Sequence, residues 1–321
     1  MTELEPQGAQ PRRDLVVVGG SAGALPALQA ILSGLDTTFS ASVLVVLHGP
    51  ASARHHLAAV LARDTGIAVA EARDGEPLRP GRVHVAPSDR HMLVANDHVH
   101  LRRGPTENGF RPAIDPLFRS AALTAGTRTV GLILSGTLDD GASGLRAIKE
   151  AGGVAMVQDP ADAEYGEMPA AADGAATADH VLPAALIAER LRAIVGRPVP
   201  PPVEGPDALR IEVLIAGLEE ATMRSEFELG RLSPFSCPDC NGNLWEIEEG
   251  ARKRYRCHTG HAYSAAVLNE MQKSELERRL YEVLRAQRER AELLRRMAKE
   301  GGPQTRAVMR QRGAATRRTP R

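Results

Sequence analysis

Short apolar runs alternate with segments of helical periodicity through the first 200 residues of the chain. The runs are four or five residues long, and in the segments between them apolar residues recur every three or four positions. This alternation predicts an α/β fold with a doubly wound, mainly parallel sheet and helices on both faces. The predicted strands are residues 15–18, 43–47, 130–134 and 154–157, and the predicted helices are 24–32, 53–63, 144–151 and a closing helix at 183–195.

Residues 83–101 interrupt this alternation with three closely spaced apolar runs. The runs are 83–86, 91–94 and 98–101, and Ala95-Asn96-Asp97 separates the last two. Asn and Asp tolerate the left-handed backbone of tight turns, so the segment predicts an antiparallel hairpin inserted into the fold.

A Pro- and Gly-rich segment, residues 197–206, predicts a linker after the first domain, 14–196. Beyond it, residues 207–299 predict a second part with three elements: a helix at 207–223, a turn-rich Cys segment at 236–264 and a long charged helix from about 265 to 299. The apolar stripe of that helix favours packing on a neighbour over a dedicated coiled coil. Residues 1–13 and the basic tail 300–321 are expected to be disordered.

Composition narrows the compartment and the partners. The chain has 40 Lys and Arg against 40 Asp and Glu, so nucleic-acid binding is not expected. The apolar runs are far shorter than the ~20 residues that cross a bilayer, which argues against membrane insertion. The N-terminus lacks a secretory signal, so we expect a cytoplasmic location.

The first predicted strand leads into Gly19-Gly-Ser-Ala-Gly23 and then a helix. A Gly-x-Ser-x-Gly turn between strand and helix exposes the Ser hydroxyl at the carboxyl edge of the sheet, which makes Ser21 a candidate nucleophile. The competing hypothesis is a dinucleotide-binding loop. It fits poorly, because Val18 stands where the first glycine of that motif belongs and the second strand ends in His48 rather than an acid.

A Ser nucleophile needs a base, and the base needs an orienting acid. His48 ends the second predicted strand, which places it at the same sheet edge as Ser21. Asp139 and Asp140 follow the strand 130–134 and either could face the site. The alternatives are a structural His and an Asp that caps the following helix.

Cys237-Pro-Asp-Cys240 and, 16 residues later, Cys257-His-Thr-Gly-His261 have the spacing of a tetrahedral zinc site. We expect Cys237, Cys240, Cys257 and His261 to be the ligands, because neighbours such as Cys257 and His258 rarely both reach one ion. Four protein ligands predict a structural Zn²⁺ and no cofactor for catalysis. Free thiols in a loop are the alternative. Mixed charges around the cluster favour protein contact over DNA contact.

Several separated motifs together resemble the catalytic domain of CheB-type chemotaxis protein-glutamate methylesterases, over about residues 14–195. The resemblance is to a stand-alone form without a receiver domain and with a C-terminal zinc-ribbon-like extension, where an Arg often replaces His258. The motifs are Val18-Gly-Gly-Ser-Ala-Gly-Ala24, Leu47-His-Gly-Pro50, Ala86-Pro-Ser-Asp-Arg-His-Met92, Arg111-Pro-Ala-Ile-Asp-Pro-Leu-Phe-Arg-Ser-Ala121, Leu134-Ser-Gly-Thr-Leu-Asp-Asp-Gly-Ala142 and Met168-Pro-Ala-Ala171.

The resemblance implies hydrolysis of glutamate γ-methyl esters on a methylated chemoreceptor-like protein, with glutamine deamidation as a related activity. It implies Ser21 as the nucleophile, His48 as the base and Asp140 as the orienting acid. Backbone N–H groups of Ala22 and Thr137 take the place of the family's oxyanion donors. A methyltransferase or a receiver protein acting in trans would be a further partner.

The chain also departs from the family pattern. Gly49 stands where Met is common, Asp139 where Asn usually precedes the acid, and Ala170 where Arg usually follows Met-Pro. Only 13 residues precede the predicted catalytic domain, 14–196, so we expect phosphorylation control to be absent or supplied by another chain. These departures keep two alternatives open, a non-catalytic signalling adaptor that uses the esterase fold as a binding module and an esterase for small molecules.

Overall fold

A computed structural model describes residues 10–48, 56–63, 65–201, 205–217, 230–250 and 252–300 of the chain. The chain divides into two units, Met1–Leu268 and Asn269–Arg321, which are described separately. The first unit holds two sheets and a hairpin, and the second holds most of one long helix.

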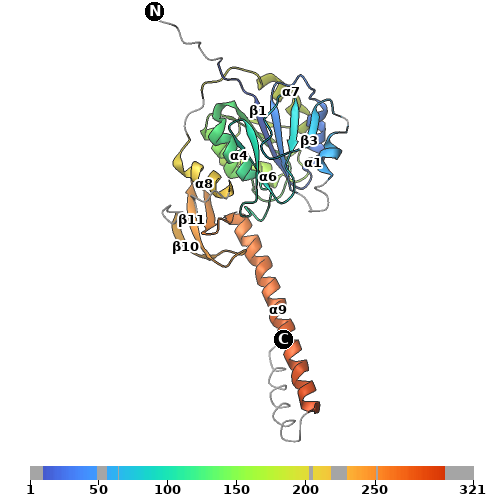
Figure 1. The fold of residues 1–321 in the computed structure, drawn as a ribbon, viewed down its shortest axis with the longest axis vertical. Helices are drawn as coiled ribbons and strands as arrows, with labels where there is room; N and C mark the ends of the chain where they lie inside the picture. The colour runs from blue at the N-terminus through green and yellow to red at the C-terminus, as the bar shows by residue number, and fades with distance from the viewer. Residues whose placement is uncertain are drawn as a thin grey trace, which may run out of the picture. The chain divides into compact units, whose positions relative to one another are not determined.

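A seven-stranded parallel sheet forms the centre of the first unit (Figure 1). Its middle strand, β1, pairs with β2 on one side and with β7 on the other. In sheet order the strands are β3 (Ala68–Glu71), β4 (Arg82–Val85), β2 (Ser42–Leu47), β1 (Leu15–Gly20), β7 (Thr129–Ile133), β8 (Val154–Gln158) and β9 (His180–Leu182). The predicted parallel sheet is therefore confirmed, with β3 and β9 as strands that the hydrophobic pattern did not indicate.

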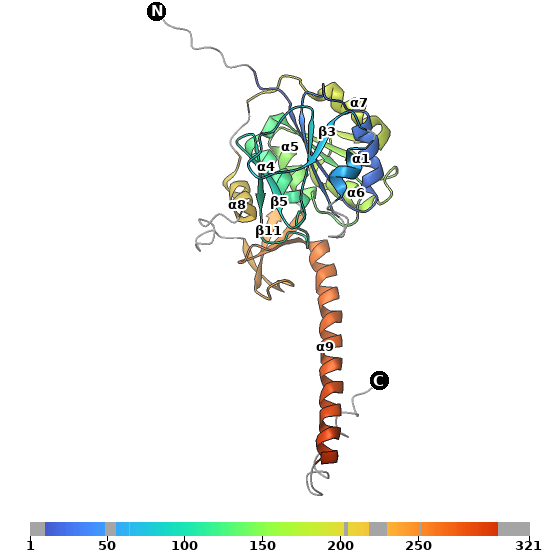
Figure 2. The same ribbon diagram turned by 45° about the vertical axis from the view of Figure 1, so that its right-hand side comes forward.

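Helices cover both faces of this sheet, as the alternation predicts (Figures 1 and 2). Val16 and Val18 point into one core and Leu15 and Val17 into the other, because successive side chains of a strand alternate. Three helices complete the first core: α1 (Ala24–Ser33), α3 (Leu57–Leu61) and α7 (Ala184–Ile194). Three others complete the second core: α4 (Ile114–Thr124), α5 (Ala142–Glu150) and α6 (Glu167–Ala176). A short 3₁₀ turn at Gly126–Arg128 precedes β7.

The inserted hairpin consists of β5 (His91–Ala95) and β6 (His98–Arg102). Its two turn residues, Asn96 and Asp97, both have positive φ angles, 50° and 56°, as a tight hairpin turn with the twist of its strands requires. The assignment of residues 83–86 to this hairpin was wrong. Residues 82–85 form β4, which pairs in parallel with β2 and β3, because a strand buried on both faces belongs inside a parallel sheet.

A second, four-stranded antiparallel sheet follows α8 (Asp207–Gly217). We call it the Cys/His sheet; its strands are β10 (Arg231–Ser236), β11 (Asn243–Glu249), β12 (Arg252–Cys257) and β13 (Ala262–Ser264). The turn-rich Cys segment is thus mostly strand. Residues 218–223 of the expected helix lie outside the described residues.

The proposed division into domains stays a prediction, and three observations bear on its boundaries. The first unit extends to Leu268 and so includes both sides of the Pro-rich segment. Arg13 N–H donates to Arg197 O at 3.0 Å and Val199 N–H to Pro11 O at 2.9 Å, so residues 11–13 are paired with the start of that segment. Residues 1–9 and the tail 301–321 lie outside the described residues.

The long helix α9 (Ala265–Glu300) confirms the predicted charged helix. Ion pairs three or four residues apart run along its surface, for example from Glu275 to Arg278 and Arg279. Leu276, Leu280 and Val283 are exposed, so the expected packing of the apolar stripe on a neighbour is not found within the described chain. None of the described helices has the length and apolar content to cross a bilayer.

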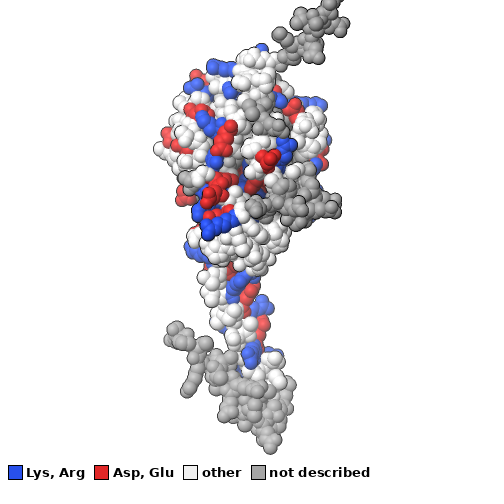
Figure 3. All heavy atoms as spheres, turned by 90° about the vertical axis from the view of Figure 1, so that its left-hand side faces the viewer, with Lys and Arg blue, Asp and Glu red and all other residues white. Residues whose placement is uncertain are grey.

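Charged side chains of both signs are mixed on the surface, as the balanced composition predicts (Figure 3). A further group of charges is buried between α4, α8 and the Cys/His sheet. Arg256 Nη2 lies 3.1 Å from Glu107 and 2.6 Å from Glu212. Arg119 contacts both of these acids, and Arg254 contacts Glu212. Burial raises the pKa of Glu212, but the surrounding guanidinium groups hold the net pKa below its usual range.

We expect Glu212→Ala to lower the free energy of unfolding by about 3–5 kcal/mol, because it leaves buried guanidinium groups without their counter-charge. Urea unfolding at neutral pH measures the effect. Glu189→Ala, which removes an exposed acid from α7, is the control and should change the value by less than about 0.5 kcal/mol. Equal values for the two variants would show that the buried group contributes nothing.

Candidate functional site

The candidate site lies where three adjacent strands end at the carboxyl edge of the central sheet. Gly20 of β1 is in register with Leu47 of β2, so Ser21 and His48 follow paired residues. His48 N–H donates to Gly20 O at 3.0 Å, and Ser21 N–H donates to Ser135 O, just after β7, at 2.9 Å. Parallel pairing therefore brings Ser21, His48 and the loop after β7 to one edge.

Small residues make the turn at Ser21 possible. A Cβ at Gly20 would lie 2.6 Å from Ala24 Cβ, and Gly23, which precedes α1, has a φ of 72°. From the β7 loop, Gly136 approaches so closely that a Cβ there would lie 2.9 Å from Ser21 Cβ. The glycines that the sequence motif contains are thus needed for chain geometry as well as for exposing the hydroxyl.

His48 is held between an acid and an aromatic ring. Its Nε2 lies 2.9 Å from Asp140 Oδ2, and both side chains are only 2% exposed. Phe110 stacks on the imidazole with ring centroids 3.7 Å apart and an interplanar angle of 10°. His48 Nδ1 is buried and has no hydrogen-bond partner among the described residues.

Asp140 accepts hydrogen bonds on both carboxylate oxygens. Ile114 N–H donates to Oδ2 at 2.7 Å, and Asn108 Nδ2 donates to Oδ1 at 2.9 Å. Burial alone raises the pKa of Asp140, but the contact with His48 and these donors outweigh it and lower the pKa below its usual range. Asp140 is therefore a carboxylate at neutral pH, as an acid that stabilises an imidazolium must be.

The neighbouring acids have other environments. Asp139 accepts a hydrogen bond from Ser264 Oγ at 2.5 Å and lies 3.9 Å from Arg252, so it faces the Cys/His sheet while Asp140 faces His48. Neither aspartate caps α5 with its side chain, since Gly141 is the cap residue. Burial and the nearby charge of Asp140 raise the pKa of Asp115 to about 8, which keeps Asp115 largely neutral at pH 7.

The expected oxyanion donors belong to the loops after β1 and β7. Ala22 and Thr137 are exposed, and neither backbone N–H donates to a described residue. Leu138 has a φ of 63°, a left-handed conformation that is unfavourable for Leu and turns the chain between Thr137 and the two aspartates. Ala170 is exposed on α6, and Gly49 lies outside the described residues.

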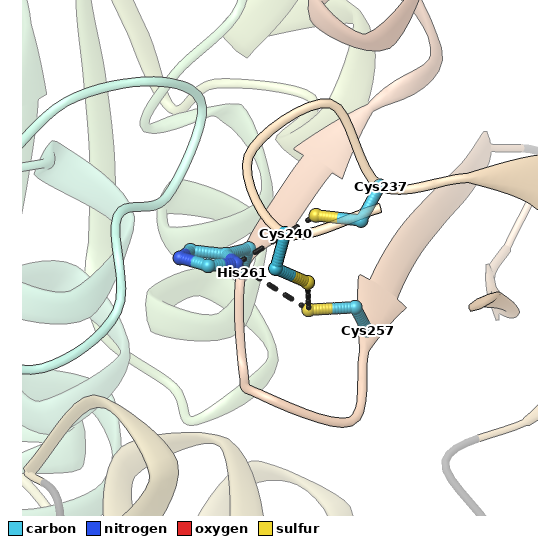
Figure 4. Close-up of side chains that lie close together, drawn as sticks. All are labelled: Cys237, Cys240, Cys257 and His261. Atoms are coloured by element: carbon cyan, nitrogen blue, oxygen red, sulfur yellow. Dashed lines mark hydrogen bonds between the residues drawn. The ribbon is translucent and has the colours of Figure 1, made fainter. Parts of the chain in front are cut away.

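The predicted metal ligands come together in the Cys/His sheet (Figure 4). The ligand atoms of Cys237, Cys240, Cys257 and His261 all lie within 4.8 Å of one another. Hydrogen bonds from Cys257, His261 and Tyr263 lower the pKa of Cys237 to about 3 although burial opposes the shift, so one thiolate forms readily. His258 is exposed and is not part of this group.

The separations between these atoms fit a tetrahedral metal ion. Cys240 Sγ lies 3.6 Å from Cys257 Sγ, and His261 Nδ1 lies 3.6 Å from Cys237 Sγ and 3.5 Å from Cys257 Sγ. Bond lengths of ~2.3 Å to sulfur and ~2.0 Å to nitrogen, at tetrahedral angles, predict separations of roughly 3.5–3.8 Å. The donor set and its spacing could therefore hold a metal ion.

Two residues of the site were missed in the sequence. Asn108 and Phe110 contact Asp140 and His48 from a loop between β6 and α4. Residues 103–110 of that loop have no periodicity and belong to none of the motifs singled out above. Their only local signal is the turn-forming pair Asn108-Gly109, both with positive φ.

Comparison with known proteins extends this picture. Residues 16–191 match the family model described as CheB methylesterase, which confirms the resemblance seen in the motifs. A protein-glutamate methylesterase/protein-glutamine glutaminase of Anaeromyxobacter dehalogenans is 42% identical over 181 residues, covering 56% of this chain and 53% of that protein. One of Xanthomonas oryzae is 39% identical over 184 residues, covering 56% and 51%. The chain thus spans about half the length of these curated relatives.

A solved structure shows the same fold for this part of the chain. The crystal structure of the Thermotoga maritima CheB methylesterase catalytic domain superposes with a TM-score of 0.55 at 34% sequence identity. The match covers 57% of this chain and 98% of the Thermotoga chain.

We expect Gly136→Ala to destabilise the protein by about 1–3 kcal/mol, because the new methyl group would meet Ser21 Cβ and Met168 Sδ. Urea unfolding measures the change. Gly174→Ala on α6 is the matched control, since a Cβ there meets nothing within 4 Å, and its stability should be unchanged or higher. Wild-type stability of Gly136→Ala would contradict the close approach of the two loops.

Proposed function

The chain belongs to the CheB methylesterase family, and we propose that it hydrolyses glutamate γ-methyl esters on a chemoreceptor-like protein in chemotaxis-type signalling. The single observation that carries this proposal is the 2.9 Å contact between His48 and a buried, ionised Asp140, at the sheet edge where Ser21 follows the neighbouring strand. Relatives that are named protein-glutamate methylesterase/protein-glutamine glutaminase support the substrate class.

In the first half-reaction, Ser21 Oγ attacks the ester carbonyl carbon while His48 accepts its proton. Because Asp140 lies at Nε2, the nitrogen that takes the proton is Nδ1. The carboxylate of Asp140 stabilises the resulting imidazolium, and the N–H groups of Ala22 and Thr137, which the family resemblance assigns as oxyanion donors, would donate to the oxyanion. Collapse of the tetrahedral intermediate breaks the bond to the methoxy oxygen, and His48 returns its proton so that methanol leaves.

The second half-reaction repeats these steps with water. His48 removes a proton from water as it attacks the acyl-Ser21 carbonyl, and then returns the proton to Ser21 Oγ. The products are a free glutamate carboxylate and the regenerated hydroxyl. A glutamine amide would follow the same course with ammonia as the leaving group, so the same residues support protein-glutamine deamidation.

We expect Ser21→Ala to lower methanol release from a methylated chemoreceptor cytoplasmic fragment by at least about 1,000-fold, because no other group can form the acyl-enzyme. The assay measures methanol without a phosphodonor. Ser33→Ala, which changes an exposed serine at the end of α1, is the matched control and should retain wild-type activity. Both variants should unfold at the wild-type temperature within a few degrees.

The alternative is a non-catalytic adaptor, and reaction with a small serine-directed phosphonate distinguishes it. An esterase should be labelled at Ser21, and Ser21→Ala should not be labelled. Absence of both methanol release and labelling in the wild type would reject the enzyme in favour of the adaptor.

We further propose that the Cys/His cluster holds one structural Zn²⁺ through Cys237, Cys240, Cys257 and His261. Three thiolates and one imidazole are the donor set that zinc prefers, and four protein ligands leave no open position for a substrate. When bound, the ion would supply folding free energy to a small sheet with few apolar residues of its own. The residues of the esterase site carry all the steps described above.

We expect elemental analysis to find about one zinc per chain, and Cys240→Ser to lose it and to lower the unfolding temperature. His258→Ala is the matched control: it removes the imidazole next to Cys257 that lies outside the cluster, and the zinc should remain. Zinc loss in His258→Ala with retention in His261→Ala would exchange the assignment of the fourth ligand.

A further inference from the structure

The loop that carries Asn108 and Phe110 is held by the Cys/His sheet. Asn108 N–H donates to Ala262 O at 2.7 Å, and Ala262 N–H donates to Thr106 O at 3.3 Å. Thr106 Oγ1 donates to Asp239 Oδ2 at 2.8 Å, inside the turn between Cys237 and Cys240. The loop therefore pairs with the first residue of β13 and is tied to the cysteine turn.

The side chain of Asn108 uses both ends of its amide. Its Nδ2 donates to Asp140 Oδ1 at 2.9 Å, with a longer 3.4 Å contact to Asp115, and its Oδ1 accepts a hydrogen bond from Ser264 N–H at 2.9 Å. The residue is 5% exposed. Because the Ser264 N–H needs an acceptor and the carboxylate needs a donor, the two partners fix which way the amide points.

Asp140 is thereby held from two sides. Oδ2 faces His48 and also accepts the Ile114 N–H, while Oδ1 faces Asn108. A carboxylate anchored at only one oxygen can rotate about its bond to Cβ, and such rotation would move Oδ2 away from the imidazole. Oδ1 has two donors, Asn108 Nδ2 at 2.9 Å and, at the longer distance of 3.4 Å, the Asp115 N–H, so Asn108 is the closer group that restrains this rotation. Phe110 in the same loop stacks on the imidazole.

We propose that Asn108 is a positioning residue for the reaction: its amide joins Ser264 of the Cys/His sheet to Asp140 and so holds the acid in place for His48. This inference rests on the proposed function, because it concerns the proposed ester hydrolysis. The rate at which a phosphonate labels Ser21 tests it without a protein substrate. It assigns to the Cys/His sheet a part in catalysis that goes beyond stabilising the fold.

The substitution Asn108→Asp tests the donor with the least change of shape. The new carboxyl group keeps an oxygen for Ser264 N–H and tolerates the φ of 52° at this position. It can donate to Asp140 only when it is protonated, and it repels Asp140 when it is ionised. We therefore expect the ratio of variant to wild-type kcat to fall as the pH rises.

Asn108→Ala removes donor and acceptor together, so the ratio of its kcat to that of wild type should be low and independent of pH. We expect kcat to fall about 10- to 100-fold, the cost of misplacing a catalytic group, with KM within about twofold. Asn96→Asp adds a carboxyl group at an exposed turn and should behave as wild type at every pH.

The ratio isolates the new group because wild type contains the same surrounding charges. Asp140 and Asp115 contact the amide directly. His48 and Arg119 contact those two acids in turn, and Asp139 contacts Ser264. All of these are present in wild type and variant alike, so the ratio reports what the new carboxyl group adds, including its effect on their titration.

Two readouts separate failure of this inference from failure of the proposed function. The rate of phosphonate labelling at Ser21 should follow the same pattern across the variants as methanol release. If wild type is labelled but releases no methanol, the substrate is wrong and the labelling rates still decide the role of Asn108. Wild-type labelling rates and kcat in Asn108→Ala would overturn the inference, as would a pH-independent ratio in Asn108→Asp.

Discussion

The close approach of α4 to the end of β1 is the constraint on which the site depends. A Cβ at Gly19 would lie 2.4 Å from Ile114 Cγ2, and one at Gly141 would lie 2.7 Å from the same atom. Both positions must therefore lack a side chain. Only with Ile114 seated between them does its N–H reach Asp140, at 2.7 Å. The glycine before the Ser21 turn and the glycine after the acid thus serve one contact, and the start of α4 becomes a donor to the carboxylate.

The same constraint creates an electrostatic difficulty, because it buries several acids close together. Asp115 follows Ile114 and comes near Asp140, so both cannot readily be ionised. The pKa values of the two acids differ because their partners differ. Contacts with His48, Ile114 and Asn108 lower the pKa of Asp140, whereas Asp115 has a pKa of about 8 and stays largely protonated. The negative charge is in this way kept on the acid that faces the imidazole.

The sequence predicts the parts of the site that follow strand ends. Ser21 and His48 could be found because a Gly-rich turn and a polar residue after an apolar run are local signals. The sequence could not distinguish the roles of Asp139 and Asp140, because these depend on what surrounds each side chain in the fold. Asp139 is directed away from His48 by its hydrogen bond from Ser264 Oγ. Residues 83–86 were assigned to the hairpin because they lie close to it along the chain, whereas residues 82–85 form a strand of the central sheet. The sequence indicated a turn at Asn108 but not its contact with the site, because its partner Ser264 is 156 residues away.

The charges of the Cys/His sheet also explain why it packs on this loop rather than standing apart. Glu107, next to Asn108, is 1% exposed and contacts Arg119 from α4 and Arg256 from β12. Arg256 in turn shares Glu212 with Arg254. Removing one member of this group while the others stay buried would leave a charge without its partner, which costs about 3–5 kcal/mol. The sheet is thus bound to the loop that holds Asp140 by charge pairing, and disturbance of the sheet reaches the acid through the shortest path, Ser264 to Asn108.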